Sequence, residues 1–294
     1  MTAVASASAS GPTLPVLRRQ ILDGWRGVAG WSTGIAGVIL IYLPLFPSMQ
    51  SPELAGMIDS LPPELVRTLG YESITTGAGY AQSTFFGLLG FALITIAGIS
   101  WGAAPTAGAE ESGQLELTLA HDVGRVRYCL ESAAALVVKL ITVGAAGYVV
   151  VWLVNDPAGL ELNAANLLAV SLAWVGLGLL AGTAAFAVGA ATGRRTLAIG
   201  AGAAWAVVGY ILQAVANNSE DLDWLRTLSP IEWAYGNAPL ATGFDWAGLA
   251  LLWGGSAVLI ALATLALALG RAPRRLRRAT QDQLGRRRTS DPCA

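Results

Sequence analysis

Charged residues are scarce in this chain. Asp, Glu, Lys and Arg together make up 13% of its 294 residues, whereas a soluble domain of average composition contains about a quarter. This is too little charge to coat a water-facing surface, and 54% of the residues are hydrophobic, with a mean hydropathy of +0.56. An ordinary soluble fold is therefore excluded.

The residue types on which many catalytic and metal sites depend are also rare. His121 is the one histidine, and neither Cys129 nor Cys293 lies near it at the spacing of a metal site. Both cysteines lie among arginines, so we expect no structural disulfide. Lys139 is the one lysine, and a phosphate-binding P-loop needs a lysine after its glycine-rich turn. We therefore expect this chain to bind no metal or cofactor and not to hydrolyse ATP by that route.

Long apolar runs, in contrast, are abundant. A membrane helix needs about 20 mainly apolar residues, whereas the strands of an outer-membrane barrel alternate apolar and polar residues over about 10 positions. Within the runs only Lys139 is charged, and glycines at four-residue spacing, such as Gly98 with Gly102 and Gly178 with Gly182, indicate dense helix packing. The sequence predicts an all-α polytopic membrane protein with six spans, at residues 28–46, 83–104, 132–154, 164–191, 196–216 and 246–270.

The basic residues predict the orientation of these spans. All except Arg67, Arg226 and Lys139 lie before the first span, between the second and third, between the fourth and fifth, or after the sixth, while acids dominate the other connections. Because cytoplasmic connections retain Lys and Arg, both termini should be cytoplasmic. We expect a multi-pass protein of the cell membrane, and specifically of a bacterial inner membrane. The basic residues on the cytoplasmic side would be Arg18, Arg19, Arg26, Arg125, Arg127, Arg194, Arg195, Arg271, Arg274, Arg275, Arg277, Arg278, Arg286, Arg287 and Arg288.

The segments that flank the spans have patterns of their own. Residues 1–13 read as a disordered tail, and the apolar spacing within residues 14–26 predicts an amphipathic elbow helix that lies flat in the membrane interface. Residues 51–69 predict short interfacial or re-entrant helices on the outer side, and the aromatics of residues 217–245 fit a belt at the level of the lipid head groups. The Arg-rich cytoplasmic tail, 271–294, fits contact with anionic lipid better than with nucleic acid.

The connection between the second and third spans, residues 105–131, differs from the others. Leu115, Leu119 and Val123 are spaced by four, so a short helix would present apolar side chains to something other than lipid. A soluble partner protein is one candidate for that surface.

At this connection the chain resembles the permeases of type-2 ATP-binding-cassette (ABC) exporters, of the bacterial multidrug and antibiotic efflux type. In that family six spans precede a basic tail, and the same connection reads Glu, any residue, Gly, Thr or Ser, Leu, Glu, then Leu-rich residues and a basic end. Gln114 departs from it where Thr is usual, as do His121 and Asp122 where a proline often ends the helix. Residues 61–65 and 228–233 also resemble family features. The matching residues are Glu111, Gly113, Leu115, Glu116, Leu117, Leu119, Arg125 and Arg127.

The resemblance implies a coupling helix that docks in a groove of a separate ATP-hydrolysing subunit. A transporter would contain two such ATP-binding subunits, which hold the ATP and Mg, and a second permease chain, identical or similar to this one. The leucines would fill the groove, Gly113 would allow a tight entry to the helix, and the acids would favour its N-terminal end or pair with arginines of the partner. The coupling residues would be Glu110, Glu111, Gly113, Leu115, Glu116, Leu117, Leu119 and Arg125.

The resemblance also suggests where a substrate would pass. The second and fifth spans of the family face the dimer axis, although for each aromatic taken singly the pattern favours contact with the protein core or with lipid. A mostly apolar path would suit a drug, an antibiotic or a lipid. The candidate lining residues are Phe85, Phe86, Trp101, Trp205, Tyr210 and Gln213.

Three other classes of membrane protein remain as alternatives. A secondary transporter usually has ionisable groups at mid-membrane, but no acid lies in any predicted span, and Lys139, about eight residues into the third, is close enough to the interface to reach water. A membrane-embedded enzyme lacks its catalytic groups here. A structural or assembly protein needs no site and is compatible with the sequence.

Overall fold

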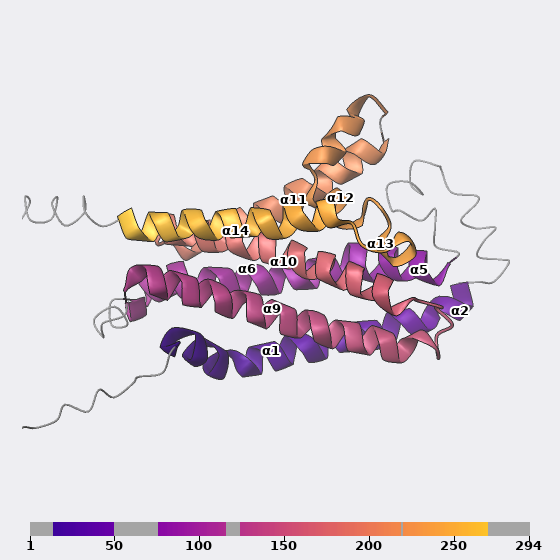
Figure 1. The fold of residues 1–294 in the computed structure, drawn as a ribbon, viewed down its shortest axis with the longest axis horizontal. Coiled ribbons are helices and arrows are strands. Elements are labelled where there is room, and N and C mark those ends of the chain that lie inside the picture. The colour runs from indigo at the N-terminus through magenta and orange to yellow at the C-terminus, as the bar shows by residue number, and fades with distance from the viewer. Residues whose placement is uncertain (1–13, 50–75, 116–123, 219, 270–294) are drawn as a thin grey trace, which may run out of the picture.

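Every regular element in the computed structural model is a helix within the residues that it describes, 14–49, 76–115, 124–218 and 220–269 (Figure 1). In these ranges six helical stretches are long and apolar enough to cross a bilayer, which confirms the predicted all-α, six-span membrane fold. The six stretches are Pro15–Ser48, Gly77–Glu111, Arg125–Asn155, Ala164–Thr192, Arg195–Asn218 and Trp246–Leu269. The predicted tails and the outer helices of residues 51–69 lie outside the described residues.

Several of these stretches are composed of more than one helical element. Long α-helices account for the first part of the first stretch and for the last four stretches, whereas the second combines α-helical and π-helical segments. The elements are α1 (Pro15–Tyr42), η1 (Leu43–Leu45), α2 (Phe46–Met49), α5 (Gly77–Tyr80), η3 (Ala81–Gly90), α6 (Phe91–Ala103), η4 (Ala104–Gly108), α7 (Ala109–Glu111), α9 (Arg125–Asn155), α10 (Ala164–Thr192), α11 (Arg195–Asn218), η5 (Glu220–Leu228), α12 (Pro230–Tyr235), α13 (Pro239–Thr242) and α14 (Trp246–Leu269).

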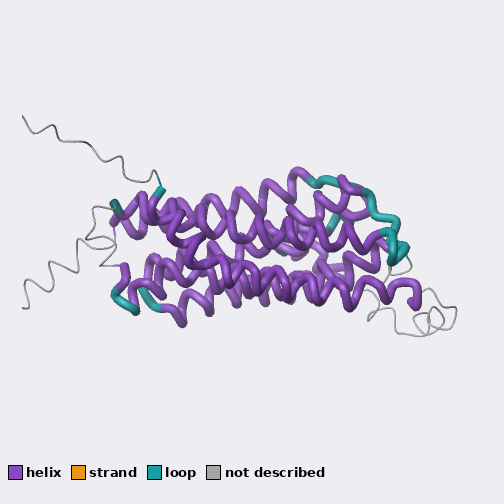
Figure 2. Tube along the Cα trace, turned by 90° about the horizontal axis from the view of Figure 1, so that it is seen from below, coloured by secondary structure: helices purple, strands orange, loops and turns teal. Residues whose placement is uncertain are grey.

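The charges of the connections gather at opposite ends of the bundle. Figures 1 and 2 show the start of α1, the start of α9, the α10–α11 connection and the end of α14 at one end. We call this the basic end, because the described arginines of these four segments lie there. We call the opposite end the acidic end. The basic end is defined by Arg18, Arg19, Arg26, Arg125, Arg127, Arg194 and Arg195, and the acidic end by Asp156, Glu161, Asp221, Asp223, Glu232 and Asp245.

The first helix differs from the prediction at its start. Residues 14–26 do not form an element separate from the first span, because α1 runs without a break from Pro15 to Tyr42. Pro15 stands in the first turn, where its fixed φ angle favours helix initiation, and the next proline is Pro44. The polar start of α1 and its apolar continuation therefore form one helix.

The fourth long helix, α10, lies at the centre of the bundle. In its most apolar stretch of 18 residues, 89% of the residues are buried. The helices α6, α9, α11 and α14 all pack on it. The Asn163 side chain caps its start by accepting from the Ala165 N–H at 2.8 Å, and Gly193, with φ +66°, ends it. The bounds of α10 therefore agree with the predicted span, 164–191, to within one residue.

Two glycine pairs allow α6 and α10 to touch through their backbones. Gly98 and Gly102 of α6 face Gly178 and Gly182 of α10, and a Cβ atom at Gly182 would lie 2.7 Å from the Gly98 carbonyl oxygen. Any side chain there would push the helices apart. The predicted dense packing at these glycines is confirmed, as a contact within one chain.

The second span has two π-helical stretches, η3 and η4, and a tyrosine from another element binds each of them. The Tyr235 hydroxyl of α12 donates to the Phe86 carbonyl in η3 at 3.0 Å, and the Tyr128 hydroxyl of α9 donates to the Pro105 carbonyl in η4 at 2.7 Å. Wide turns change the backbone hydrogen-bond register and leave carbonyls in need of partners. Burial raises the pKa of the Tyr235 phenol, so its hydroxyl stays protonated and can donate.

Candidate coupling region and translocation path

The segment that leaves the second span turns sharply at Gly113. The Gly113 N–H donates to the Glu110 carbonyl at 3.1 Å, and Gly113 has φ +72°, a left-handed conformation that glycine adopts without strain. The chain therefore makes a tight turn at Gly113. Glu116, Leu117 and Leu119, which carry the rest of the predicted coupling motif, lie outside the described residues.

Leu115 does not have the exposed position expected of a residue that fills a partner's groove. Its side chain is 1% exposed and packs with Val16 of α1, Ala109 of α7 and Tyr128 of α9. Leu115 thus joins the connection to the bundle of its own chain. The spacing of the leucines indicated an apolar face but could not show that α1 and α9 cover its first member.

The glutamates of α7 contact the start of α11. The Arg195 backbone N–H donates to Glu111 Oε1 at 2.8 Å, so this carboxylate caps α11 from a different span. A Cβ atom at Gly193, in the α10–α11 turn, would lie 2.6 Å from the Glu110 carboxyl carbon. The acids were expected to favour the start of their own helix or to pair with a partner's arginines, and Glu111 instead binds within the chain.

Glu131 binds the start of α1 in a similar way. This residue of α9 is 4% exposed, and its Oε2 accepts from the N–H groups of Val16 at 2.8 Å and Leu17 at 3.0 Å. Its Oε1 accepts from Arg127 Nε at 2.7 Å. A carboxylate at a helix N-terminus satisfies free N–H groups and interacts favourably with the helix dipole.

Sequence reasoning missed the role of Glu131. The one local signal was an acid four residues after Arg127 at the edge of an apolar run. Nothing in that pattern names α1 as the partner, because the residues that Glu131 caps lie more than a hundred positions earlier.

The ends of the second and third spans, on either side of this connection, therefore hold two other helices. Glu111 binds the start of α11, and Glu131, with the Leu115 cluster, binds the start of α1. Arg125, the remaining described coupling candidate, is the first residue of α9 and is partly exposed. A displacement of this connection would be passed to the ends of α1, α9 and α11.

Two of the candidate path residues belong to the core. Phe85 and Phe86 are 0% and 1% exposed, and both rings contact Trp174 of α10, with centroid distances of 5.6 and 5.8 Å. Their side chains face no surface of this chain, so in this structure they do not line a path. Trp101 is partly buried, and its ring faces the Lys139 ammonium group at 5.9 Å.

The other three candidates lie on α11. Tyr210 stacks on Phe91 of the second span with ring centroids 6.3 Å apart, and Gln213 Nε2 donates to Glu232 Oε2 of α12 at 2.7 Å. Trp205 is 41% exposed. Figure 1 shows the last part of α11, together with η5, rising away from the bundle.

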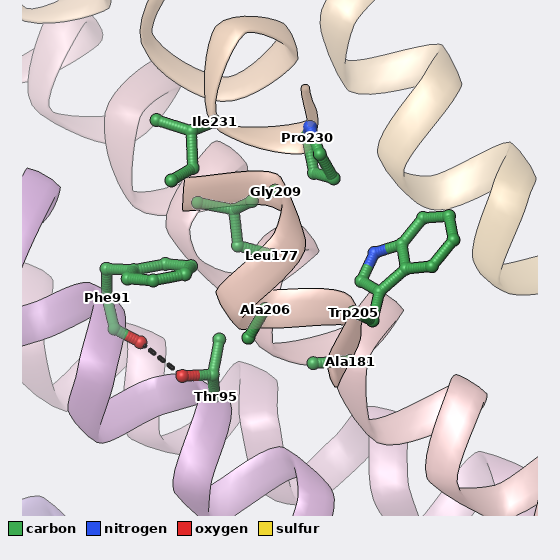
Figure 3. A pocket seen from close by; sticks show the side chains of 9 residues that line it. All are labelled: Phe91, Thr95, Leu177, Ala181, Trp205, Ala206, Gly209, Pro230 and Ile231. Atoms are coloured by element: carbon green, nitrogen blue, oxygen red, sulfur yellow. Dashed lines mark hydrogen bonds between the residues drawn. The ribbon is translucent and has the colours of Figure 1, made fainter. Parts of the chain in front are cut away.

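Trp205 also lines a small apolar pocket between α6, α10, α11 and α12 (Figure 3). Its cavity volume of about 10 Å³ has room for roughly one water-sized group. The Thr95 hydroxyl beside it donates to the Phe91 carbonyl at 2.7 Å and so is already used within the helix. In this conformation the pocket cannot hold a drug-sized molecule. Its lining residues are Phe91, Thr95, Leu177, Ala181, Trp205, Ala206, Gly209, Pro230 and Ile231.

No cluster of three or more His, Cys, Asp or Glu side chains that could hold a metal ion occurs among the described residues, a set that leaves out His121. Cys129 is buried and accepts a hydrogen bond from the Thr264 hydroxyl at 3.3 Å.

No family model and no curated protein matches this chain. The chain is a membrane protein, and six helices of its described residues are long and apolar enough to cross a bilayer.

Proposed function

We propose that this chain is the transmembrane permease subunit of an ATP-driven ABC exporter that moves a hydrophobic or amphipathic molecule, such as a drug, an antibiotic or a lipid. The observation that carries the proposal is the connection between the second and third spans. Glu111 and Glu131, at the two span ends that flank this connection, hold the starts of α11 and α1, which belong to two other spans. A force applied there would reach the ends of α1, α9 and α11 together, as coupling to an external motor requires.

The proposal assigns ATP hydrolysis to a separate subunit. The single lysine of the chain, Lys139, lies within α9 and follows no phosphate-binding loop. Two ATP-binding subunits would dock at the basic end, which would then face the cytoplasm, and a second permease chain would complete the transporter. The exposed apolar side of α11, including Val207, Val208 and Ile211, gives lipid or that second chain a surface to cover.

A secondary transporter is the alternative class. Its coupling ion would need an ionisable site near mid-membrane. Among the acids of the described spans, Asp23 is exposed and paired with Arg19, and Glu110 and Glu111 lie at a helix end. Glu131 lies two turns from the start of α9, with its carboxylate already bound to α1 and Arg127. The one lysine, Lys139, lies in the first half of α9, on the side of the basic end. This distribution favours an external source of energy over an ion gradient.

The test joins a contact measurement to a transport measurement. A photo-crosslinking amino acid at Leu117, in membranes of the native host, should trap a protein that contains a phosphate-binding P-loop. Inverted vesicles from the same cells should accumulate an amphipathic fluorescent dye when ATP is supplied, and Glu116→Arg should abolish this accumulation. Asp23→Asn is the matched control, because Asp23 is an exposed acid at the same end whose carboxylate pairs with Arg19.

Two results would contradict the proposal. One is accumulation of the dye by the purified chain in liposomes that contain no ATPase. The other is a Glu116→Arg variant that transports as the native chain does.

A further inference from the structure

The ammonium group of Lys139 lies between three helices, and no acid of the described residues pairs with it. Its Nζ is 5.9 Å from the centroid of the Trp101 ring of α6. On its other side is Gly24 of α1, where a Cβ atom would lie 2.9 Å from Nζ and 3.0 Å from Cε. The absence of a side chain at Gly24 thus leaves the space that the end of Lys139 occupies.

The charged groups nearest in sequence to this contact on α1 have other partners. The Asp23 carboxylate is 3.4 Å from Arg19 Nε, and the Arg26 guanidinium lies over the Trp25 ring at 5.8 Å. Among the described residues, Lys139 has no hydrogen bond or ion pair to an acid of α1, α6 or α9, and its side chain is partly buried. An ammonium group carries three donors, and leaving them unmet in a partly buried position is costly.

The level of this ammonium group is set by α1. Gly24 lies between Asp23 and Arg26, both exposed and charged, so Nζ is at the height of polar side chains and not at mid-bilayer. Side chains of a helix lean toward its N-terminus, and in α9 this direction leads to the basic end. Lys139 therefore reaches the head-group level, as a lysine near a helix end can do.

The surroundings of this position are open to the bilayer. Gly27 of α1 and Ala104, just after α6, are exposed, and a Cβ atom at Gly30 or Gly34 would meet no atom within 4 Å. The helix surface next to the ammonium group thus has room for an acyl chain along α1. Arg19 and Arg26 make the neighbourhood positive, which favours an anionic ligand.

We propose that Lys139, Trp101 and Gly24 form a binding site for the phosphate of an anionic phospholipid in the leaflet at the basic end. The phosphate would accept hydrogen bonds from Nζ and neutralise its charge, while the Trp101 indole would hold the ammonium group in place. The lipid tail would follow the side of α1 that carries Gly30 and Gly34. This site is independent of the proposed ATP coupling.

The experiment uses the full-length chain purified in detergent and measures lipid binding by native mass spectrometry. The native chain should bind phosphatidylglycerol more tightly than phosphatidylcholine. Lys139→Met keeps the length of the side chain but removes its charge, and should weaken phosphatidylglycerol binding about tenfold, the size expected for the loss of a charged hydrogen bond at a partly exposed site. Phosphatidylcholine binding should change much less.

A pair of glycine variants tests the position without removing the charge. Gly24→Ala should displace the ammonium group and weaken phosphatidylglycerol binding, whereas Gly200→Ala, which meets open space on α11, should have no effect. Arg194→Gln removes an exposed charge elsewhere at the basic end and should also leave binding unchanged. The proposal is overturned if Lys139→Met binds phosphatidylglycerol as the native chain does, if Arg194→Gln has the same effect as Lys139→Met, or if the two glycine variants behave alike.

Discussion

Replacing Glu131 with alanine should release the start of α1 from the bundle. The change removes the two hydrogen bonds from Val16 and Leu17 to a nearly fully buried carboxylate. Loss of a helix cap costs typically about 1 kcal/mol, and each hydrogen bond to a charged acceptor contributes about 1.5–3 kcal/mol. The Arg127 partner is half exposed, so that pair adds little. We expect the first turn of α1 to lose about 2–3 kcal/mol of local stability, since water replaces part of what is lost.

Hydrogen exchange measured by mass spectrometry, on the chain in detergent or in nanodiscs, reports this local loss directly. A loss of 2–3 kcal/mol corresponds to about 30- to 150-fold faster exchange of the amides in the first turn of α1. Peptides from the middle of α10 should exchange as before. Glu131→Gln keeps an acceptor oxygen and should lie between the two, while Asp23→Asn, at an exposed ion pair, should change little. Unaltered exchange at Val16 and Leu17 in Glu131→Ala would refute the capping argument.

Three further changes address other contacts, each measured by thermal unfolding in detergent. Leu115→Ala should cost about 2–4 kcal/mol, the usual loss for a fully buried leucine, and an unchanged midpoint would mean that Leu115 faces outward. Gly102→Val should prevent the close contact with Gly182 and leave little folded protein; normal yield and stability would disprove that contact. Tyr235→Phe should cost about 1 kcal/mol by removing the hydrogen bond to the Phe86 carbonyl, and a neutral effect would show that this carbonyl needs no partner.

Matched variants separate these contacts from general effects. Leu22→Ala replaces an exposed leucine at the same end as Leu115, and Gly30→Val adds the same bulk as Gly102→Val where a Cβ atom would meet open space. Tyr210→Phe removes a hydroxyl for which no such carbonyl partner is found among the described residues. All three should leave the unfolding midpoint near its native value.

The composition and the apolar runs predicted the class of fold and the positions of the spans, because a bilayer imposes a length and a polarity on each helix. For α10 the prediction was correct to within one residue, since Asn163 caps the start of the helix and Gly193 ends it. The start of α1 was predicted less well. Its amphipathic pattern indicated a helix, but no local feature showed that it would continue into the span.

The contacts of the candidate coupling region could not be read from the sequence. Glu111 and Glu131 each bind the start of a helix from another span, and their role follows from which helix ends meet in space. Leu115 matched the pattern of a leucine that faces a partner, yet α1 and α9 cover it. Spacing along one segment reports which residues share a face, and only the tertiary arrangement decides what lies opposite that face.

The central position of α10 has a consequence for how the chain is made. Its sides are covered by helices that precede it, α6 and α9, and by helices that follow it, α11 and α14. Leu252 of α14 is fully buried, and the Trp253 indole donates to the Leu172 carbonyl of α10 at 3.3 Å. Until α14 has been synthesised, the side of α10 that α14 covers must therefore face lipid. Chains truncated before Trp246 lack α14, so that side of α10 should stay uncovered and membrane proteases should degrade these chains.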